Sequence, residues 1–220
     1  MAQQSAIAQQ SAARVFKAVI WDQGNVLDSH RESDRQIAAA LGLDFADFQR
    51  YASRHIRAAH LGLDEVKFFN RVLKDAGRPA TAEPMLREIW GKYRPVNERM
   101  LYVNQQVRAQ GYKTAILSNA ETVLRDMMQE RYGVPGENCT DFDAIVCSCE
   151  EGYAKPDREI YEKVCGLLGI APSEGILVDD SAKNVKGFRD MGGYAILHVD
   201  DVSTAKELSG LLGCSLTLGP

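Results

Sequence analysis

Five short, mostly apolar runs rich in β-branched residues recur along the chain, and segments with helical spacing alternate with the later ones. Strands that alternate with helices require right-handed crossovers, so this order predicts an α/β fold built on a parallel sheet. The predicted strands are Phe16–Trp21, Lys113–Ser118, Asp143–Ser148, Gly175–Asp179 and Tyr194–Val199. The predicted helices are Glu121–Arg131, Arg158–Leu168, Asn184–Met191 and Thr204–Leu212.

One interval interrupts this alternation. From Ser29 to about Pro95 the sequence contains no strand pattern, only segments with helical spacing. We therefore expect an all-helical lobe, residues 29–95, inserted into a Rossmann-like three-layer core formed by residues 14–28 and 96–220. The repeated AQQSA near the N-terminus has neither the charge nor the apolar run of a secretory signal, so residues 1–13 are expected to form a flexible extension.

Three helices are expected within this lobe. Asp64 caps one that ends at Gly77, and Glu83–Tyr93 forms another. Asp44 caps the remaining helix, whose apolar residues recur at the spacing of one buried face: Phe45, Phe48, Ala52, Ile56 and Ala59.

The lobe also differs from the rest of the chain in charge, because it carries a basic surplus whereas the remaining residues are acidic. Arg50, Arg54 and Arg57 fall on one helical face. That face is either an ordinary solvated surface or a basic wall over an anionic ligand.

Composition argues against several classes of function. The net charge of −4 is unlike that of a dedicated nucleic-acid-binding protein, which usually carries a basic surplus. No apolar run approaches the roughly 18–20 residues of a membrane span. An odd number of cysteines, five, suits reduced thiols better than a disulfide framework, so we expect a cytoplasmic protein without membrane or nucleic-acid partners.

Polar residues stand where four of the predicted strands end. Ligands of an open parallel sheet bind beyond the carboxyl ends of its strands, so these residues are expected to share one rim. They are Asp22 after the first strand, Ser118 and Asn119 after the second, Lys155 in the loop after the third, and Asp179 and Asp180 after the fourth. Each has an ordinary explanation as a turn or cap residue, but their conjunction favours a single site.

The chemistry of this set fits phosphoryl transfer. Two carboxylates that face each other, Asp22 and Asp180, repel unless a cation lies between them, and Mg²⁺ prefers such oxygen ligands. The Lys155 ammonium and a neighbouring hydroxyl, Ser118, can hold the remaining phosphoryl oxygens. Asp22 can then attack phosphorus to form an aspartyl-phosphate that water hydrolyses. The turn at Gly24-Asn25 lets backbone groups approach the ion and the phosphate.

Four motifs in this order resemble those of the haloacid dehalogenase superfamily, in particular a phosphatase-like branch with a small α-helical cap and a D-x-G-N first motif. The motifs are "VIWDQGNVLDS", "AILSNA", "AKPDREIY" and "GILVDDSAKNVKGFRDMG", and the resemblance spans Val15 to about Val199. It implies that the lobe is a cap and that Asp22 is the nucleophile. Further implied roles are phosphate binding by Ser118 and Lys155, substrate contacts from Gly24, Asn25 and Asn119, and metal binding by Asp22, Asp180 and the Gly24 carbonyl, supported by Asp179 and Asn184.

Gly24 departs from the usual pattern of that superfamily, in which a second aspartate at this position protonates the leaving oxygen and later activates water. Loss of such a group typically costs about 10²–10⁴-fold in rate. We therefore expect slow turnover of alkyl phosphates and better turnover of anomeric or aryl phosphates. A cap histidine, His55 or His60, is a candidate substitute.

The sequence thus predicts a Mg²⁺-dependent phosphomonoester hydrolase for a small, sugar-phosphate-like metabolite. Two alternatives stay open. Hydrolytic dehalogenation of 2-haloacids uses an aspartate nucleophile without metal, but Asp179 and Asp180 would then repel an anionic substrate. A binding protein without turnover is supported only by Gly24, since Asp22, Ser118 and Lys155 are all present.

Overall fold

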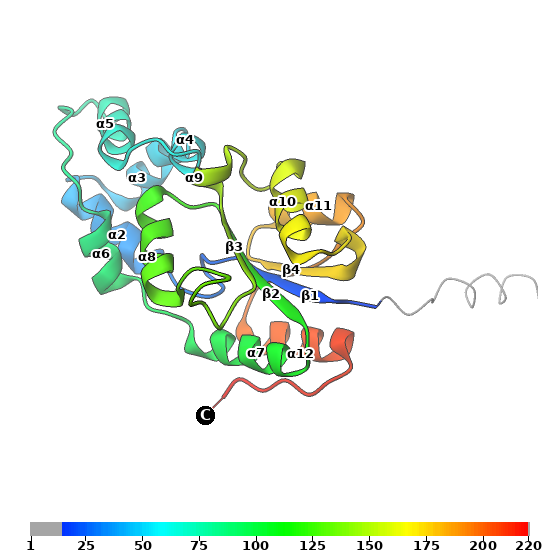
Figure 1. The fold of residues 1–220 in the computed structure, drawn as a ribbon. Helices are drawn as coiled ribbons and strands as arrows, with labels where there is room; N and C mark the ends of the chain where they lie inside the picture. Colours follow the sequence, from blue (N-terminus) through cyan, green and yellow to red (C-terminus); the bar gives the residue numbers. More distant parts are fainter. Residues whose placement is uncertain (1–14, 220) are drawn as a thin grey trace, which may run out of the picture.

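A five-stranded, fully parallel sheet forms the centre of the computed structural model, which describes residues 15–219 (Figure 1). Its strand order is β3-β2-β1-β4-β5, so the first strand of the chain lies in the middle. The strands are β1 (Ala18–Trp21), β2 (Lys113–Ser118), β3 (Ala144–Cys147), β4 (Gly175–Asp179) and β5 (Tyr194–Leu197). The predicted α/β fold is confirmed, and the predicted N-terminal extension lies outside the described residues.

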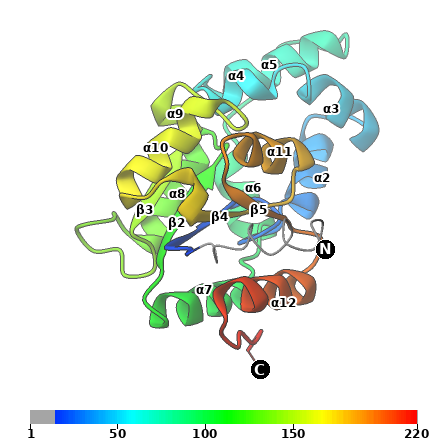
Figure 2. The ribbon, with the colours of Figure 1, turned by 90° about the vertical axis from the view of Figure 1, so that its right-hand side faces the viewer.

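Helices cover both faces of the sheet, which gives the three layers of a Rossmann-like fold (Figures 1 and 2). On one face lie α10 (Arg158–Leu168) and α11 (Ala182–Asp190), and on the other lie α7 (Glu98–Ala109) and α12 (Asp201–Leu212). Side chains of a strand alternate between faces, and Ile20 accordingly packs with the first pair whereas Trp21 packs with the second. Burial on both faces, complete in β1 and β4 and broken only at the ends of β2 and β5, explains why these strands read as nearly continuous apolar runs.

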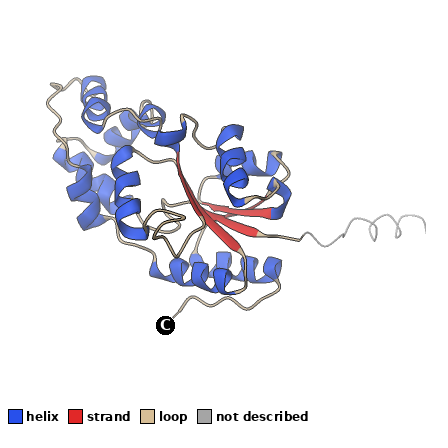
Figure 3. Cartoon of the chain, in the orientation of Figure 1, coloured by secondary structure: helices blue, strands red, loops and turns tan. Residues whose placement is uncertain are grey.

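The inserted lobe contains only helices among residues 29–95, which we call the cap (Figure 3). They are α2 (Arg31–Ala40), α3 (Phe45–Ala52), α4 (Ile56–His60), α5 (Glu65–Asp75) and α6 (Leu86–Tyr93). As expected, Asp44 accepts a hydrogen bond from Ala46 N and Asp64 accepts one from Lys67 N. The helix α2 was not expected.

The helix expected to run from Phe45 to Ala59 is broken into α3 and α4. Ser53 Oγ donates back to the carbonyl of Arg50 at 2.9 Å, and the residues up to His55 form a turn. A serine that bonds locally to the backbone competes with helix continuation. The break leaves Arg50 in α3, Arg54 in the turn and Arg57 in α4, so the three arginines do not share one helical face.

The chain enters and leaves the cap through two adjacent segments that are hydrogen-bonded to each other. Ser29 N donates to Pro95 O at 3.0 Å, and Asn97 N donates to Leu27 O at 2.8 Å. Beside them a buried ion pair joins Arg94 Nε to Asp28 Oδ2 at 2.7 Å. The remaining helices are α8 (Thr122–Tyr132) and α9 (Ser148–Glu151), near the cap. Within residues 15–219 the helices are too short or too polar to cross a membrane.

Candidate active site

A cavity of about 540 Å³ lies between the carboxyl end of the sheet and the cap. Seven of the predicted site residues line it: Asp22, Gly24, Ser118, Asn119, Lys155, Asp180 and Asn184. The parallel arrangement explains this convergence, because β1, β2 and β4 all end at the same edge. Asn25 and Asp179 do not line the cavity but contact residues that do.

The Lys155 ammonium is buried and held between two buried carboxylates. Its Nζ lies 2.7 Å from Oδ1 of Asp22 and 2.7 Å from Oδ2 of Asp179. The other oxygen of Asp179 accepts from Asn184 Nδ2 and from Ser181 N, both at 2.9 Å. Asp179 therefore fixes the position of Lys155 rather than facing the cavity itself.

The Asn119 amide fixes the backbone of the same lysine. Its Oδ1 accepts from Lys155 N at 2.7 Å, and its Nδ2 donates to Lys155 O at 3.0 Å. This pair of bonds ties the loop after β3 to the end of β2. The position of the ammonium is thus set from the backbone as well as from its carboxylate partners.

The charges at this end of the cavity do not balance. Carboxylate oxygens of Asp22, Asp179 and Asp180 lie within 4.8 Å of one another, against the single ammonium of Lys155. Burial raises the pKa of Asp22 to about 7 although Lys155 opposes the shift, and Asp179 and Asp180 raise it further. The pKa of Lys155 is raised, since the two aspartates outweigh the opposing effect of burial. A divalent cation with oxygen ligands fits this excess of negative charge.

Asn25 orients the exposed carboxylate of Asp180. It has a left-handed backbone with φ of 55°, a conformation that asparagine tolerates better than most residues. Its Nδ2 donates to Asp180 Oδ2 at 2.8 Å and also lies 2.9 Å from His30 Nε2. The turn after β1 therefore links Asp180 to the beginning of the cap.

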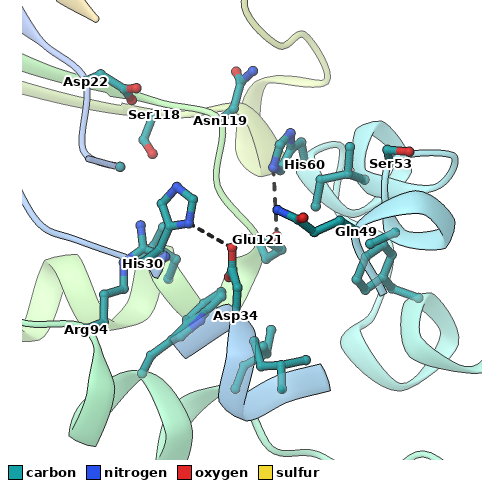
Figure 4. Close-up of a pocket in the computed structure, with 18 of the residues that line it drawn as sticks. Asp22, His30, Asp34, Gln49, Ser53, His60, Arg94, Ser118, Asn119 and Glu121 are labelled. Carbon is teal, nitrogen blue, oxygen red and sulfur yellow. Dashed lines mark hydrogen bonds and ion pairs between the residues drawn. The ribbon is translucent and has the colours of Figure 1, made fainter. Parts of the chain in front are cut away.

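The cap lines the opposite side of the cavity, mostly with apolar side chains (Figure 4). These are Ile37, Phe48, Ala52, Ile56, Phe68, Phe69, Leu86 and Trp90. The hypothesis of a basic wall is wrong. Its three arginines are absent from the lining and pair instead with Asp47, Asp75 and Asp157.

Of the two cap histidines suggested as proton donors, only His60 lines the cavity. Its Nε2 lies 3.8 Å from Glu121 Oε1, and burial lowers its pKa. His55 contacts Asp75 Oδ2 at 3.2 Å, away from the lining residues. The prediction that His55 could replace the missing acid is therefore wrong.

Sequence reasoning missed His30, Asp34 and Arg94, which also line the cavity. His30 Nδ1 lies 2.9 Å from Asp34 Oδ2, and this hydrogen bond raises the pKa of His30 against the opposing effect of burial. The available signal was the spacing of four residues in "HRESD", which brings histidine and aspartate together once a helix begins there.

Comparisons with known proteins agree with this architecture. The chain is 30% identical over 234 residues to mouse acyl-CoA dehydrogenase family member 10, a match that covers 95% of the chain but only 20% of that protein. It is 27% identical to D-ribitol-5-phosphate phosphatase from Bacteroides thetaiotaomicron, covering 90% of the chain and 99% of the relative.

A crystal structure of a HAD family enzyme variant from Bacteroides thetaiotaomicron, in complex with magnesium and inorganic phosphate, shares the fold. Its TM-score is 0.62 at 20% identity, with 82% of this chain and 93% of that chain covered. A sequence model of haloacid dehalogenase-like hydrolases matches residues 6–192. A match of that extent shows that the chain belongs to the haloacid dehalogenase-like hydrolase family.

Proposed function

We propose that the protein is a Mg²⁺-dependent phosphomonoester hydrolase that works through an aspartyl-phosphate on Asp22. The observation that carries this proposal is the buried ion pair of Asp22 with Lys155, at 2.7 Å, beside the carboxylate of Asp180. The phosphatase from Bacteroides thetaiotaomicron that matches nearly the whole chain supports the same reaction class.

In the proposed reaction an Asp22 oxygen bonds to phosphorus while the bond from phosphorus to the alcohol oxygen breaks. Lys155 and Ser118 hold the phosphoryl oxygens, on which negative charge is spread. Asp22, Asp180 and the Gly24 carbonyl would hold Mg²⁺, and Asp179 and Asn184 would support that set. When bound, the ion neutralises charge on the phosphate and favours the ionised form of its carboxylate ligands.

The substrate is a small phosphorylated metabolite in this proposal. Its phosphate lies at the core end of the cavity and its alcohol part faces the cap. Sugar phosphates belong in the first test panel, but the apolar cap lining also favours esters with a hydrocarbon or aromatic part.

We also propose that residues 14–28 and 96–220 act as the catalytic core, that residues 29–95 act as the cap, and that the enzyme works in the cytoplasm. The haloacid dehalogenase alternative is less well supported. A dehalogenase needs no cation. Three carboxylates clustered around one ammonium favour the binding of a cation.

The test is a panel of phosphorylated metabolites assayed with Mg²⁺ and with chelator, for wild type and for Asp22→Asn. We expect release of phosphate only by wild type with Mg²⁺, and a covalent phosphate on Asp22 in quenched samples. Halide release from a 2-haloacid in chelator would instead support the dehalogenase. Phosphate binding without turnover by any ester would support the non-catalytic alternative.

A further inference from the structure

A histidine occupies the space of the side chain that Gly24 lacks. A Cβ placed on Gly24 would lie 3.3 Å from Cδ2 and 3.7 Å from Nε2 of His30. An aspartate carboxylate extending from that carbon would therefore enter the volume of the imidazole ring. Figure 4 shows His30 between Asp22 and Ser118 on one side and Asp34 on the other.

The contacts of His30 define which nitrogen faces the reaction. Nδ1 lies 2.9 Å from Oδ2 of Asp34, and an ionised carboxylate only accepts hydrogen bonds, so Nδ1 carries a hydrogen. Nε2 lies 2.9 Å from Nδ2 of Asn25, which can only donate. In the neutral ring Nε2 therefore accepts from Asn25, whereas in the protonated ring Nε2 carries a hydrogen and must turn from that donor to the leaving oxygen. The Asp34 carboxylate behind the ring accepts from Nδ1 in both forms, as in other histidine bases.

Other groups near this position are less suited to proton transfer. Arg94 Nη2 would lie 3.7 Å from the same Cβ, but a guanidinium does not release its proton in proteins. Arg94 is also held by Asp28 at 2.7 Å. His60 contacts Glu121 on the far side of the cavity rather than the turn at Gly24.

We propose that His30, positioned by Asp34, carries the protons that the missing aspartate would otherwise carry. This inference rests on the proposed aspartyl-phosphate route. As Asp22 attacks, the bond from phosphorus to the alcohol breaks, and the leaving oxygen takes a proton from Nε2 of protonated His30. Water then attacks the aspartyl-phosphate, its proton passes to Nε2, and the bond from phosphorus to Asp22 breaks. Inorganic phosphate leaves, and His30 is again protonated.

The proposal reverses one expectation from the sequence. Gly24 by itself predicts poor turnover of alkyl phosphates, whose leaving oxygens need a proton. With His30 in place the enzyme is expected to hydrolyse alkyl and aryl phosphates at comparable rates. His30 is then a catalytic residue, and Asp34 is a positioning residue that acts through it.

The test compares an alkyl phosphate with p-nitrophenyl phosphate in rapid-quench experiments with Mg²⁺. His30→Gln keeps a polar side chain of similar reach but cannot exchange protons. We expect its first turnover of the alkyl ester to slow by about 10²–10⁴-fold. Its first turnover of the nitrophenyl ester should stay within a few-fold of wild type, because nitrophenolate leaves unprotonated. Hydrolysis of the intermediate should then stall, with a burst of nitrophenol and phosphate retained on Asp22.

Three further variants sharpen the result. Asp34→Asn should show the same pattern more weakly, whereas His60→Gln should leave the ratio of the two first-turnover rates unchanged. The double variant Gly24→Asp with His30→Gly restores the usual aspartate and the room for it, and should recover alkyl turnover. Equal slowing of both first turnovers by His30→Gln, without a burst, would overturn the role of His30, as would an unchanged alkyl rate. If the wild type formed no phosphorylated Asp22, the result would instead contradict the proposed function, which requires that intermediate.

Discussion

The core side and the cap side of the cavity are built on different principles. On the core side, the charged groups at the centre are buried and held by one another, as Lys155 is held by Asp22 and Asp179. On the cap side most of the lining is apolar: Arg50 and Arg54 pair with aspartates outside it, and the titratable groups that do line it, such as His30 and Asp34, lie at the edge next to the core. Fixed charges suit one chemical group in one orientation, whereas an apolar wall accommodates many shapes. The core side is therefore suited to phosphate and the cap side to the variable part of the substrate.

The largest effect is expected from the centre of the core side. Lys155→Met leaves Asp22 and Asp179 buried without their cation, and breaking a buried pair in this way typically costs about 3–5 kcal/mol of unfolding free energy. We expect kcat/KM to fall by at least about 10³-fold, because a fixed charge on the phosphoryl oxygens is lost. Chemical denaturation and steady-state kinetics measure the two quantities. Lys183→Met, at an exposed neighbouring position, is the matched control. If Lys155→Met were less stable but kept the kcat/KM of the wild type, the ammonium would have a structural role alone.

The next largest effect is expected at Asp180, where a substitution should weaken metal binding without lowering the free energy of unfolding. Asp180 is exposed, and its carboxylate accepts a side-chain hydrogen bond from Asn25. We expect Asp180→Asn to keep the unfolding free energy of the metal-free protein and to weaken Mg²⁺ binding by more than about tenfold. Calorimetric titration with Mg²⁺, and the rise in Tm that Mg²⁺ produces, both report this. Asp190→Asn, which removes another exposed carboxylate, should bind Mg²⁺ like wild type.

The two sides also differed in how far the sequence predicted them. The strands β2 and β4 have the predicted bounds, and the polar residues after β1, β2, β3 and β4 converge as expected. That success follows from a strict geometric rule, since the carboxyl ends of parallel strands share one edge. Asp179 is the partial exception, because its backbone position was evident but its partner, Lys155, is remote in sequence.

The cap could not be predicted in the same way. Helical spacing identified its helices except α2, but a side chain's direction depends on where each helix breaks and on what it packs against. The local bond of Ser53 turns the chain between α3 and α4, so Arg57 faces the core rather than the cavity. The role inferred for His30 likewise depends on its approach to Gly24, which no spacing along the chain reveals.

A smaller effect is expected on the cap side. Ile56 is half-buried and lines the cavity, so Ile56→Ala removes apolar contact with the substrate but no charge. We expect KM for an aryl phosphate to rise by up to about tenfold, with kcat nearly unchanged, since each buried methylene contributes about 0.8 kcal/mol. The inhibition constant of inorganic phosphate should not change, because phosphate lies at the core side. Ile89→Ala, outside the lining, is the control. A weaker binding of inorganic phosphate would show that the two sides are not independent.

The smallest effect concerns the contact that joins the two sides. Arg57 Nη2 lies 2.6 Å from Asp157 Oδ2, and the same oxygen accepts from Ala154 N, next to Lys155. The arginine side chain is 56% exposed, so its ion pair is expected to contribute less than about 1 kcal/mol. Arg57→Gln should therefore change kcat/KM by no more than about threefold at low salt, and the difference should vanish at high salt as screening weakens the pair. A drop in kcat of tenfold or more that persists in high salt would contradict a weak, screened ion pair as the only role of Arg57. Arg57 would then hold the loop of Lys155 in its working position, and the cap would help to build the phosphate site rather than only enclose it.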